Sequence, residues 1–474
     1  MRYKKRKVHQ NITITGIADK GKGVGRTEDG QVLFVEEVAP GDVVDVVVLR
    51  KKAGFAHGAP QHFHHYSEDR VEPFCQHFHV CGGCKWQHLS YEAQLKHKEL
   101  IVENALKRIG KVDVQEFFPI LPAASSTFYR NKLEFTFSNK RWLTSEEMKS
   151  GVAIENRNAV GFHRPGEFDK IVDVYKCWLQ PEPSNAIRNA AREIANAQNL
   201  DFFDAKRKEG FLRNLVVRVA TTGEVMLVMS FLEDDPSRIR PFLDALLLQF
   251  PEITTLCYCV NPKVNDFILD LDILTYYGKG YIEEQLGHVR FKVGPKSFFQ
   301  TNTRQGKRLY DIAIEFADLK GTENVYDLYT GVGSIALYAA QNARQVVGIE
   351  EIEAAIVDAN ENARLNNIDN TIFYAGDVKD ILTTEFVAKY GKPDVLITDP
   401  PRAGMHPQVV EMLLQLESPK IVYVSCNPAT QARDLNILSA KYDVLKVQPV
   451  DMFPHTDHIE SIALLELEDG RMRE

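Results

Sequence analysis

One cysteine stands where a nucleophile could work. Cys426 directly follows the apolar, β-branched stretch at residues 421–425, so we expect it at the exit of a buried strand. An isolated cysteine is usually a small buried hydrophobe, but a strand exit offers the partly exposed, polar setting that a reactive thiol needs. Glu460 begins the last apolar stretch. If that final strand runs antiparallel beside the strand at residues 421–425, the thiol of Cys426 and the carboxylate of Glu460 lie at the same edge of the sheet. There they could act as nucleophile and base.

A glycine-containing turn follows another apolar stretch, at residues 324–329. Gly331 and Gly333 let the backbone turn tightly and approach a ligand closely. Glu350 ends the next stretch, nineteen residues after Gly331, where a carboxylate could accept hydrogen bonds from ribose hydroxyls. With Ala336 at its third position the turn also satisfies the NAD fingerprint. On this motif alone, the turn could bind S-adenosylmethionine, bind a dinucleotide or have a purely structural role.

Two further motifs lie beside expected strand ends. Asp399-Pro400-Pro401-Arg402 ends a later apolar stretch. Amino-directed nucleic-acid methyltransferases often carry an aromatic ring where Arg402 stands, so Arg402 disfavours chemistry on an exocyclic amine. The segment at residues 297–302 brings in Gln300 and Asn302. An amide there can bond a cofactor or a base edge, although Asn302 is equally suited to cap the next helix.

Three cysteines lie within ten residues. Cys75, Cys81 and Cys84 surround two glycines, and Cys177 lies far downstream. Zinc normally prefers paired Cys-x₂₋₄-Cys units, whereas three close thiolates and one distant thiolate suit a [4Fe–4S] cluster. The spacing favours the cluster and leaves zinc or free thiols as alternatives. Cys257 and Cys259 alternate within an apolar strand and are expected in the core.

The elements that must position these residues fall into three parts. Residues 1–67 alternate short strands with glycine turns, as a small closed OB-type barrel does. Residues 68–290 hold the cysteines, a helical pattern at about 91–110 and a β-rich α+β region. In residues 291–474 seven apolar strands alternate with helices, which predicts a doubly wound α/β domain. Such sheets bind ligands beyond the carboxyl ends of their parallel strands.

Composition narrows the class of protein. The chain has 474 residues, 44% hydrophobic and 26% charged, which is typical of a globular protein of several domains. No stretch is apolar enough for a membrane helix and no secretory signal begins the chain, so we expect a cytoplasmic protein. The net charge of −8 argues against indiscriminate coating of nucleic acid. Residues 1–67 nevertheless carry eleven Lys or Arg against seven Asp or Glu, which indicates an RNA-facing module or a solvated face.

Taken together, the chain resembles the S-adenosylmethionine-dependent RNA 5-methyluridine methyltransferases. The resemblance rests on an ordered set: the N-terminal barrel, which is similar to a TRAM domain, the Cys-Gly-Gly-Cys core, Phe-x-Gln-x-Asn, Gly-x-Gly, Asp-Pro-Pro-Arg, Ser-Cys-Asn-Pro and His-Ile-Glu. It implies a Rossmann-like methyltransferase domain at the C-terminus and a [4Fe–4S] cluster held by Cys75, Cys81, Cys84 and Cys177.

The resemblance also implies roles for the remaining site residues. Cys426 would add to C6 of uracil and Glu460 would remove the C5 proton. Residues on the cofactor or the target base would be Gln300, Tyr329, Ser334, Glu350, Asp377 and Asp399. The family often has Phe, Asn and Asn in place of Tyr329, Ser334 and Asp377. Arg130, Lys132, His163 and Arg164 of the middle region could hold RNA.

The barrel and the cysteine set look more like the members that modify 23S rRNA than the tRNA member. We therefore expect a monomeric enzyme acting on 23S rRNA, with tRNA as the first alternative. A non-catalytic iron–sulfur RNA-binding protein would leave the Cys426 and Glu460 pair without a role. An NAD dehydrogenase would give no role to Cys426 or to the Asp-Pro-Pro-Arg motif.

Overall fold

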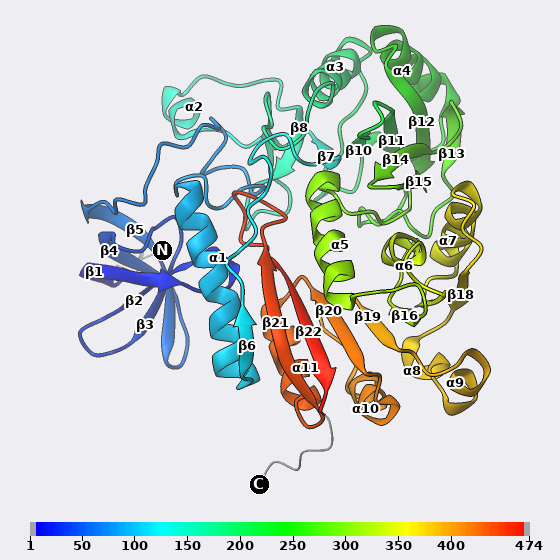
Figure 1. Ribbon diagram of the computed structural model, residues 1–474. Helices are drawn as coiled ribbons and strands as arrows, with labels where there is room; N and C mark the ends of the chain where they lie inside the picture. Colours follow the sequence, from blue (N-terminus) through cyan, green and yellow to red (C-terminus); the bar gives the residue numbers. More distant parts are fainter. Residues whose placement is uncertain (1–5, 469–474) are drawn as a thin grey trace.

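The protein contains three β-structured parts, and the computed structural model describes residues 6–468 (Figure 1). A small barrel lies on one side, and a seven-stranded sheet and an eight-stranded sheet are stacked end to end beside it. A two-stranded sheet joins the two larger ones. It consists of β14 (Ile282–Leu286) and β15 (Val289–Val293). No helix within residues 6–468 is long and apolar enough to cross a membrane.

The N-terminal part is a closed five-stranded barrel with strand order β1-β2-β3-β5-β4, as the sequence predicts. Its strands, with one short 3-10 turn, are β1 (Val8–Ile17), η1 (Asp19–Gly21), β2 (Gly23–Arg26), β3 (Val32–Val35), β4 (Val43–Lys51) and β5 (Phe55–His65). Two glycines of this part, Gly23 and Gly25, belong to a strand and not to one of the expected glycine turns. Both lie in β2, where a Cβ would come within 2.3 Å of Val38 and 2.5 Å of Ile12, so glycine allows the barrel wall to close.

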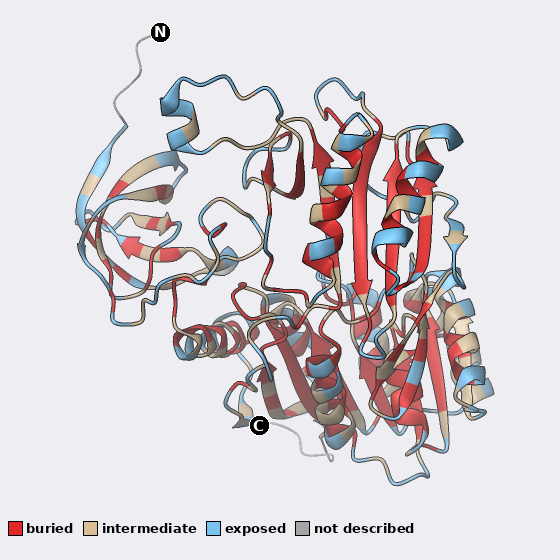
Figure 2. Ribbon diagram, turned by 90° about the horizontal axis from the view of Figure 1, so that it is seen from above, coloured by how far each residue is buried: buried red, intermediate tan, exposed pale blue. Residues whose placement is uncertain are grey.

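The middle part is built on a sheet of order β13-β12-β11-β10-β7-β8-β9, in which β10 and β11 form a hairpin. Its interior is one cluster of buried apolar side chains, and Figure 2 shows its strands as largely buried. Its elements are β7 (Lys132–Ser138), α2 (Ser145–Ser150), β8 (Ala159–His163), β9 (Ile171–Asp173), α3 (Ser184–Ala197), β10 (Leu212–Val219), β11 (Val225–Phe231), α4 (Pro236–Gln249), β12 (Ile253–Val260) and β13 (Leu274–Tyr277). Cys257 and Cys259 are buried in this sheet.

The C-terminal sheet has the order β18-β17-β16-β19-β20-β22-β21-β6, in which β22 runs antiparallel to both of its neighbours. Its strands are β16 (Asn324–Leu328), β17 (Gln345–Glu350), β18 (Thr371–Ala375), β19 (Val395–Thr398), β20 (Lys420–Ser425), β21 (Tyr442–Val450) and β22 (Glu460–Leu467), with β6 (Val114–Phe117) at one edge. The sheet therefore has one strand more than the seven expected from the sequence. The eighth strand, β6, comes from before the middle sheet and pairs in parallel with β21.

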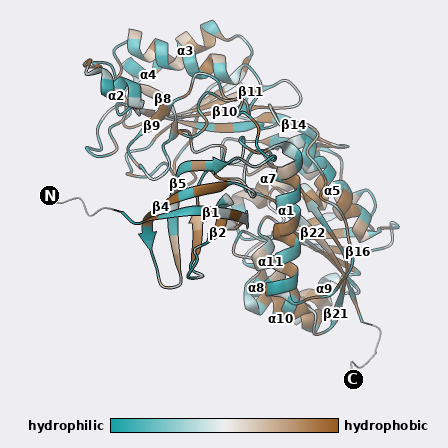
Figure 3. Ribbon diagram, turned by 90° about the vertical axis from the view of Figure 1, so that its left-hand side faces the viewer, coloured by the Kyte–Doolittle hydropathy of each residue, from teal (hydrophilic) through white to brown (hydrophobic). Residues whose placement is uncertain are grey.

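Helices cover both faces of this sheet and enclose two separate apolar cores. The helices are α1 (Tyr91–Ala105), the π-helical turn η2 (Leu106–Gly110), α5 (Thr303–Ala317), α6 (Ser334–Ala340), α7 (Glu353–Leu365), α8 (Val378–Ile381), α9 (Thr384–Tyr390), α10 (Pro407–Leu416) and α11 (Pro428–Leu438). Figure 3 shows α1 beside α11, and Val102 of α1 shares a core with Leu435 of α11. Residues 91–117 thus add a helix and a strand to the C-terminal sheet.

Candidate active site and cysteine pocket

Cys426 and Glu460 lie opposite each other at the carboxyl edge of the C-terminal sheet. Strands β20 and β22 are antiparallel, and Ser425 pairs with Ser461. The same register places Cys426, the residue after β20, opposite Glu460, the first residue of β22. Antiparallel pairing therefore brings together two residues that are distant in the sequence.

Burial disfavours the ionised form of both groups. Burial, followed by the nearby Glu460 and Asp399 carboxyl groups, raises the pKa of the Cys426 thiol to about 11. Burial and then Asp399 raise the pKa of Glu460 well above that of an ordinary carboxyl. Arg402 lowers the pKa of both groups. Arg402 is therefore the cation placed to favour a thiolate and a carboxylate at this rim.

A second pair of buried carboxyl groups lies nearby. Burial raises the pKa of Asp399, which follows β19, to about 7. Asp327 lies in the neighbouring strand β16, and burial raises its pKa to about 7 as well. Its carboxylate accepts a 2.5 Å hydrogen bond from the hydroxyl of Thr330. Carboxyl groups that titrate near neutral pH can accept or donate a hydrogen bond, which suits contact with a polar ligand.

The turn after β16 is anchored on Glu350. Gly331 donates its N–H to Glu350 Oε2 at 3.0 Å, and the N–H of Ile352 is 3.0 Å from Oε1. Tyr329 adopts a φ of 63°, a left-handed conformation that is rare for a bulky residue. A strained backbone of this kind is typical of ligand-binding turns.

Three of the expected ligand-contacting residues surround a tyrosine that sequence reasoning missed. The hydroxyl of Tyr310, on α5, lies 3.0 Å from Ser334 Oγ. Burial raises the pKa of this tyrosine, the charge of Asp399 adds to the rise, and hydrogen bonds with Ser334 and Gln300 oppose it. Tyr310 thus joins Gln300, Ser334 and Asp399 into one cluster. A buried tyrosine on an amphipathic helix looks like ordinary core in the sequence, so no signal distinguished it.

Asp377 lies at the end of β18, next to the strand that ends at Glu350. Its side chain caps α8 by accepting the N–H of Lys379 at 3.1 Å, and it pairs with the ammonium group of Lys379. That hydrogen bond with Lys379 is the largest cause of a lowered pKa for Asp377. Its charge also contributes to the raised pKa of Tyr329, so the two side chains interact.

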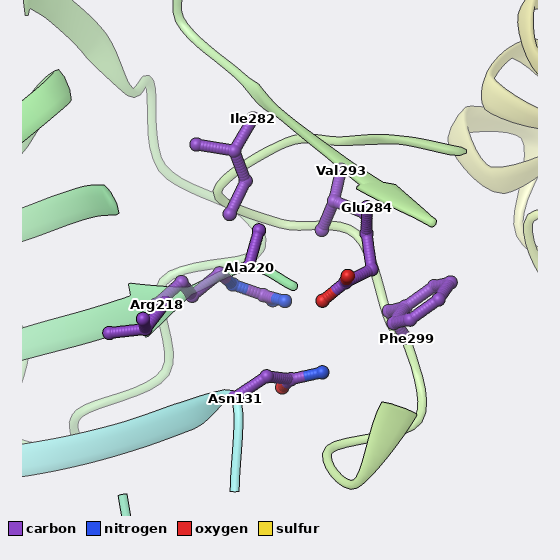
Figure 4. A pocket seen from close by; sticks show the side chains of 8 residues that line it. Asn131, Arg218, Ala220, Ile282, Glu284, Val293 and Phe299 are labelled. Atoms are coloured by element: carbon purple, nitrogen blue, oxygen red, sulfur yellow. The ribbon is translucent and has the colours of Figure 1, made fainter. Parts of the chain in front are cut away.

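The middle sheet holds the segment that carries Gln300. Asn131 Nδ2 donates to the Gln300 carbonyl at 2.9 Å and to Thr303 Oγ1 at 2.8 Å. Arg218 Nη2 donates to the Ser297 carbonyl at 2.7 Å. Figure 4 shows the small pocket that Asn131 and Arg218 line together with Glu284. In it, Arg218 and Glu284 are turned toward one another. Asn302 caps α5, accepting the N–H of Gln305 at 3.2 Å, and donates to the Met452 carbonyl at 2.9 Å.

The loop at residues 451–459, which leads into Glu460, is fixed by helix α1 and by the segment after Cys84. Lys98 Nζ lies 2.6 Å from Asp451 Oδ1 and 3.0 Å from the Phe453 carbonyl. The carbonyl of His455 accepts the N–H groups of Lys85 at 2.8 Å and Trp86 at 3.1 Å. The loop therefore connects the cysteine segment with the rim that carries Cys426 and Glu460.

The four expected ligand cysteines line one pocket, together with Phe78, Phe162 and Val174. All four are free thiols. Burial raises the pKa of each of them, to about 12 for Cys81 and Cys84, and neighbouring thiols add to the rise for Cys81, Cys84 and Cys177. Within the described part of the chain, no group of three or more His, Cys, Asp or Glu side chains is arranged to hold a single metal ion.

Comparisons with known proteins agree with this architecture. Residues 275–468 match the model of the tRNA (uracil-5-)-methyltransferase family, and residues 6–60 match that of the TRAM domain. The chain is 53% identical to an uncharacterized RNA methyltransferase of Bacteroides thetaiotaomicron, over 95% of this chain and 100% of that one. It is 39% identical to an uncharacterized RNA methyltransferase of Chlorobaculum tepidum, over 98% of each chain.

Among solved structures, the chain is similar to the tRNA (uracil-54, C5)-methyltransferase of Pyrococcus abyssi in complex with S-adenosyl-L-homocysteine. The TM-score is 0.73 with 29% sequence identity, and the match covers 96% of this chain and 99% of that one. Barrel, middle sheet and C-terminal sheet are therefore shared over nearly the whole length. The chain belongs to the TRAM-containing RNA uracil-5-methyltransferase family.

Proposed function

We propose that this protein transfers a methyl group from S-adenosylmethionine to C5 of a uridine in RNA. The observation that carries the proposal is the position of Cys426 opposite Glu460, with Arg402 acting on both. C5 of uracil is a weak nucleophile and has to be activated before it can be methylated. A thiol and a carboxyl group side by side supply the two functions that this activation requires.

The proposed reaction begins when the Cys426 thiol loses its proton to solvent, and the resulting thiolate, which Arg402 favours, adds to C6 of uracil. This forms an S–C6 bond and moves electron density through the enolate to C5. C5 then takes the methyl group, and the electrons of the bond that held this group stay on the donor sulfur, which leaves as a neutral thioether. The Glu460 carboxylate removes the proton from C5, the electrons of the C–H bond reform the C5–C6 double bond, and the thiolate of Cys426 leaves. The target base must leave its stack to reach the half-buried Cys426 at the edge of the sheet.

S-adenosylmethionine supplies an electrophilic methyl group on a positively charged sulfur. We propose that Gln300, Tyr329, Ser334, Glu350, Asp377 and Asp399 contact it or the target base, and we add Tyr310 as the group that orients Gln300 and Ser334. Glu350 keeps lone pairs on both carboxylate oxygens for ribose hydroxyls after accepting two backbone N–H groups. Asp399 could instead contact the uracil, because it lies beside Cys426.

We further propose that Cys75, Cys81, Cys84 and Cys177 hold a [4Fe–4S] cluster. The donor set fits such a group: four thiols with no disulfide line one pocket, and the N–H of Gly83 donates to Cys81 Sγ at 3.4 Å. The cluster would support structure and RNA docking, because the proposed reaction has no redox step. Anaerobically purified protein should contain about four iron and four sulfide per chain. Stoichiometric zinc without labile sulfide would contradict the cluster.

For the substrate we propose 23S rRNA, bound through the barrel of residues 1–67. The resemblance to the 23S rRNA members, which have both a barrel and the cysteines, supports this choice. A tRNA substrate is the second candidate, because the tRNA enzyme of Pyrococcus abyssi matches the chain over 96% of its length.

One experiment tests the reaction and separates the two substrates. Purified protein is incubated with S-adenosylmethionine and either 23S rRNA or tRNA from a strain lacking this protein, and the nucleosides are analysed by mass spectrometry. We expect 5-methyluridine to appear in 23S rRNA at one or a few sites. Its appearance in tRNA alone would transfer the proposal to tRNA, and a methylated product other than 5-methyluridine would contradict the proposed chemistry.

A further inference from the structure

A group of aromatic side chains lies at the surface beside the cysteine pocket. Trp178 packs against Phe74, with ring centroids 5.6 Å apart, and against Phe128, at 5.5 Å. Phe74 and Phe128 are 42% and 40% exposed, although large apolar side chains are normally buried. We call Phe74, Phe128 and Trp178 the aromatic platform.

The platform is held in place rather than loosely exposed. The N–H of Phe128 donates to the Trp178 carbonyl at 2.7 Å, and the Phe128 backbone adopts a φ of 52°. A bulky residue in the left-handed region is strained, and such strain persists only where the surroundings enforce it. Phe74 also contacts the ring of His455, at 5.1 Å.

Cations accompany the rings on the side that leads to Cys426. Lys176 Nζ lies 3.8 Å from the centre of the Trp178 ring, and the Arg130 guanidinium lies 5.0 Å from that of Phe453. Farther along the loop that carries Phe453, His458 Nδ1 is 3.4 Å from Nη2 of Arg402, which comes from the segment after β19. Within residues 6–468, none of these three cations forms an ion pair with a carboxylate. They remain available to an anionic ligand.

We infer that the aromatic platform binds unstacked nucleotides of the RNA that flank the target uridine. Exposed rings provide stacking surfaces for bases, and unpaired cations beside them suit phosphates. A protein partner would not need this alternation of rings and free cations along a path to the catalytic rim. The inference rests on the proposed function, since it takes RNA as the substrate.

The cysteine pocket lies where it can hold the parts of the aromatic platform together. Phe74 directly precedes Cys75, and Lys176 and Trp178 flank Cys177. Lys176 and Trp178 also line the pocket itself. Any group that ties Cys75 to Cys177 therefore fixes the distance between the two halves of the platform.

The test is binding of a single-stranded RNA of about eight nucleotides, within the usual site size of single-strand binders, to the anaerobically purified, metal-containing protein. Fluorescence anisotropy of the labelled RNA gives the dissociation constant. Trp178→Ala should weaken binding roughly 5- to 150-fold, the loss expected for one stacked base. Trp178→Phe should keep most of the affinity, which separates stacking from misfolding. An RNA of the same length without bases should bind weakly and should not distinguish wild type from Trp178→Ala.

The chain offers a matched control on the opposite edge of the middle sheet. Phe267 is 53% exposed, and Lys263 lies 5.3 Å from the centre of its ring. Phe267→Ala should leave RNA binding unchanged. Trp178 should also report binding directly, since the RNA should quench tryptophan fluorescence in wild type but much less in Trp178→Phe.

Equal affinity of wild type and Trp178→Ala, or equal binding of RNA with and without bases, would overturn the inference. If wild type forms 5-methyluridine under those outcomes, the proposed function stands and only the platform is wrong. If binding depends on the rings but no RNA acquires 5-methyluridine, the proposed function fails and the platform remains an RNA site. Capture of a protein partner that Trp178→Ala no longer binds, without loss of RNA affinity, would also overturn it.

Discussion

The ammonium group of Lys98 lies 2.6 Å from the carboxylate of Asp451, and neither side chain is exposed to solvent. Lys98 belongs to α1, which precedes the middle sheet, whereas Asp451 begins the loop that leads into Glu460. Asp451 also accepts a 2.8 Å hydrogen bond from the hydroxyl of Tyr91. The position of the proposed base therefore depends on a helix more than 300 residues earlier in the chain.

Replacing Lys98 with methionine should strongly destabilise the protein. The substitution leaves the Asp451 charge buried without its partner, which typically costs about 3–5 kcal/mol. Lys107→Met is the matched control, because Lys107 pairs with Glu103 at 2.5 Å on the exposed surface of the same segment. It should change the free energy of unfolding by no more than about 0.5 kcal/mol. Chemical denaturation measures the free energy of unfolding of both variants. A similar loss of stability in the two would show that the buried pair stabilises the protein no more than the exposed pair does.

Tyr310→Phe should weaken binding of S-adenosylmethionine. The variant keeps the ring and removes only the hydroxyl that bonds Ser334. Loss of a hydrogen bond of about 0.5–1.5 kcal/mol corresponds to roughly 2- to 10-fold in the dissociation constant. Calorimetric titration measures this constant. Tyr338→Phe serves as the control, because the Tyr338 hydroxyl bonds Asp311 and should leave the affinity unchanged. Equal changes of the dissociation constant in the two variants would show that S-adenosylmethionine does not bind beside Tyr310.

Alkylation of Cys426 in the free protein should be slow at neutral pH and should speed up as the pH rises. The thiolate is the reactive form, and burial with neighbouring carboxyl groups raises the pKa of Cys426 to about 11. The rate should therefore increase about tenfold per pH unit until the pH approaches that pKa. Peptide-resolved mass spectrometry after iodoacetamide treatment gives the rate for this cysteine alone. A plateau already at about pH 8.5, the ordinary thiol range, would contradict the assigned environment.

The same measurement on Arg402→Met tests the role of the neighbouring cation. Arg402 lowers the pKa of Cys426, so its removal should raise that pKa further. Alkylation at a fixed pH below the pKa should then be slower than in wild type. Faster alkylation would show that Arg402 acts mainly as a steric shield.

Removing positive charge from the barrel should lower RNA affinity and flatten its salt dependence. Arg50, Lys51 and Lys52 are exposed at the end of β4 and in the turn that follows. Each contact with a phosphate of single-stranded RNA contributes about 0.7 to the slope of log K against log salt. The triple alanine variant should therefore lose about two units of slope. Lys389→Ala, on α9 before the amino end of β19, should lose none. An unchanged slope in the triple variant would exclude this edge from the RNA contact.

Most of the architecture could be predicted because its signals are local or set by topology. The alternation of apolar strands with helices predicts the α/β sheet, and an antiparallel last strand brings Glu460 to the rim that ends at Cys426. Strand β6 could not be predicted. It has only four residues, two of them the polar Gln115 and Glu116, and its partner β21 lies more than 300 residues away. Its pairing exists only in the folded chain.

The candidate site divides in the same way. The sequence places Cys426, Asp399 and Glu350 at the carboxyl ends of strands. Because open parallel sheets bind ligands at that edge, these residues could be predicted as site residues. Tyr310 and Asn131 act through tertiary contacts, and each looks in the sequence like an ordinary core or turn residue. The aromatic platform was likewise hidden, because Phe74, Phe128 and Trp178 come from three separate segments. The target RNA stays a prediction, since a related tRNA enzyme has the same architecture.

The proposed reaction requires that Cys426 form a covalent bond with the uracil that is methylated. RNA in which uridine is replaced by 5-fluorouridine tests this directly. A base can remove a proton from C5 but not fluorine as a cation, so the methylated adduct should remain attached to the protein. Protease digestion and mass spectrometry should then find the nucleotide, with its added methyl group, on Cys426, and Cys426→Ala should form no adduct. Efficient formation of 5-methyluridine by Cys426→Ala, or an adduct on another residue, would show that Cys426 is not the nucleophile.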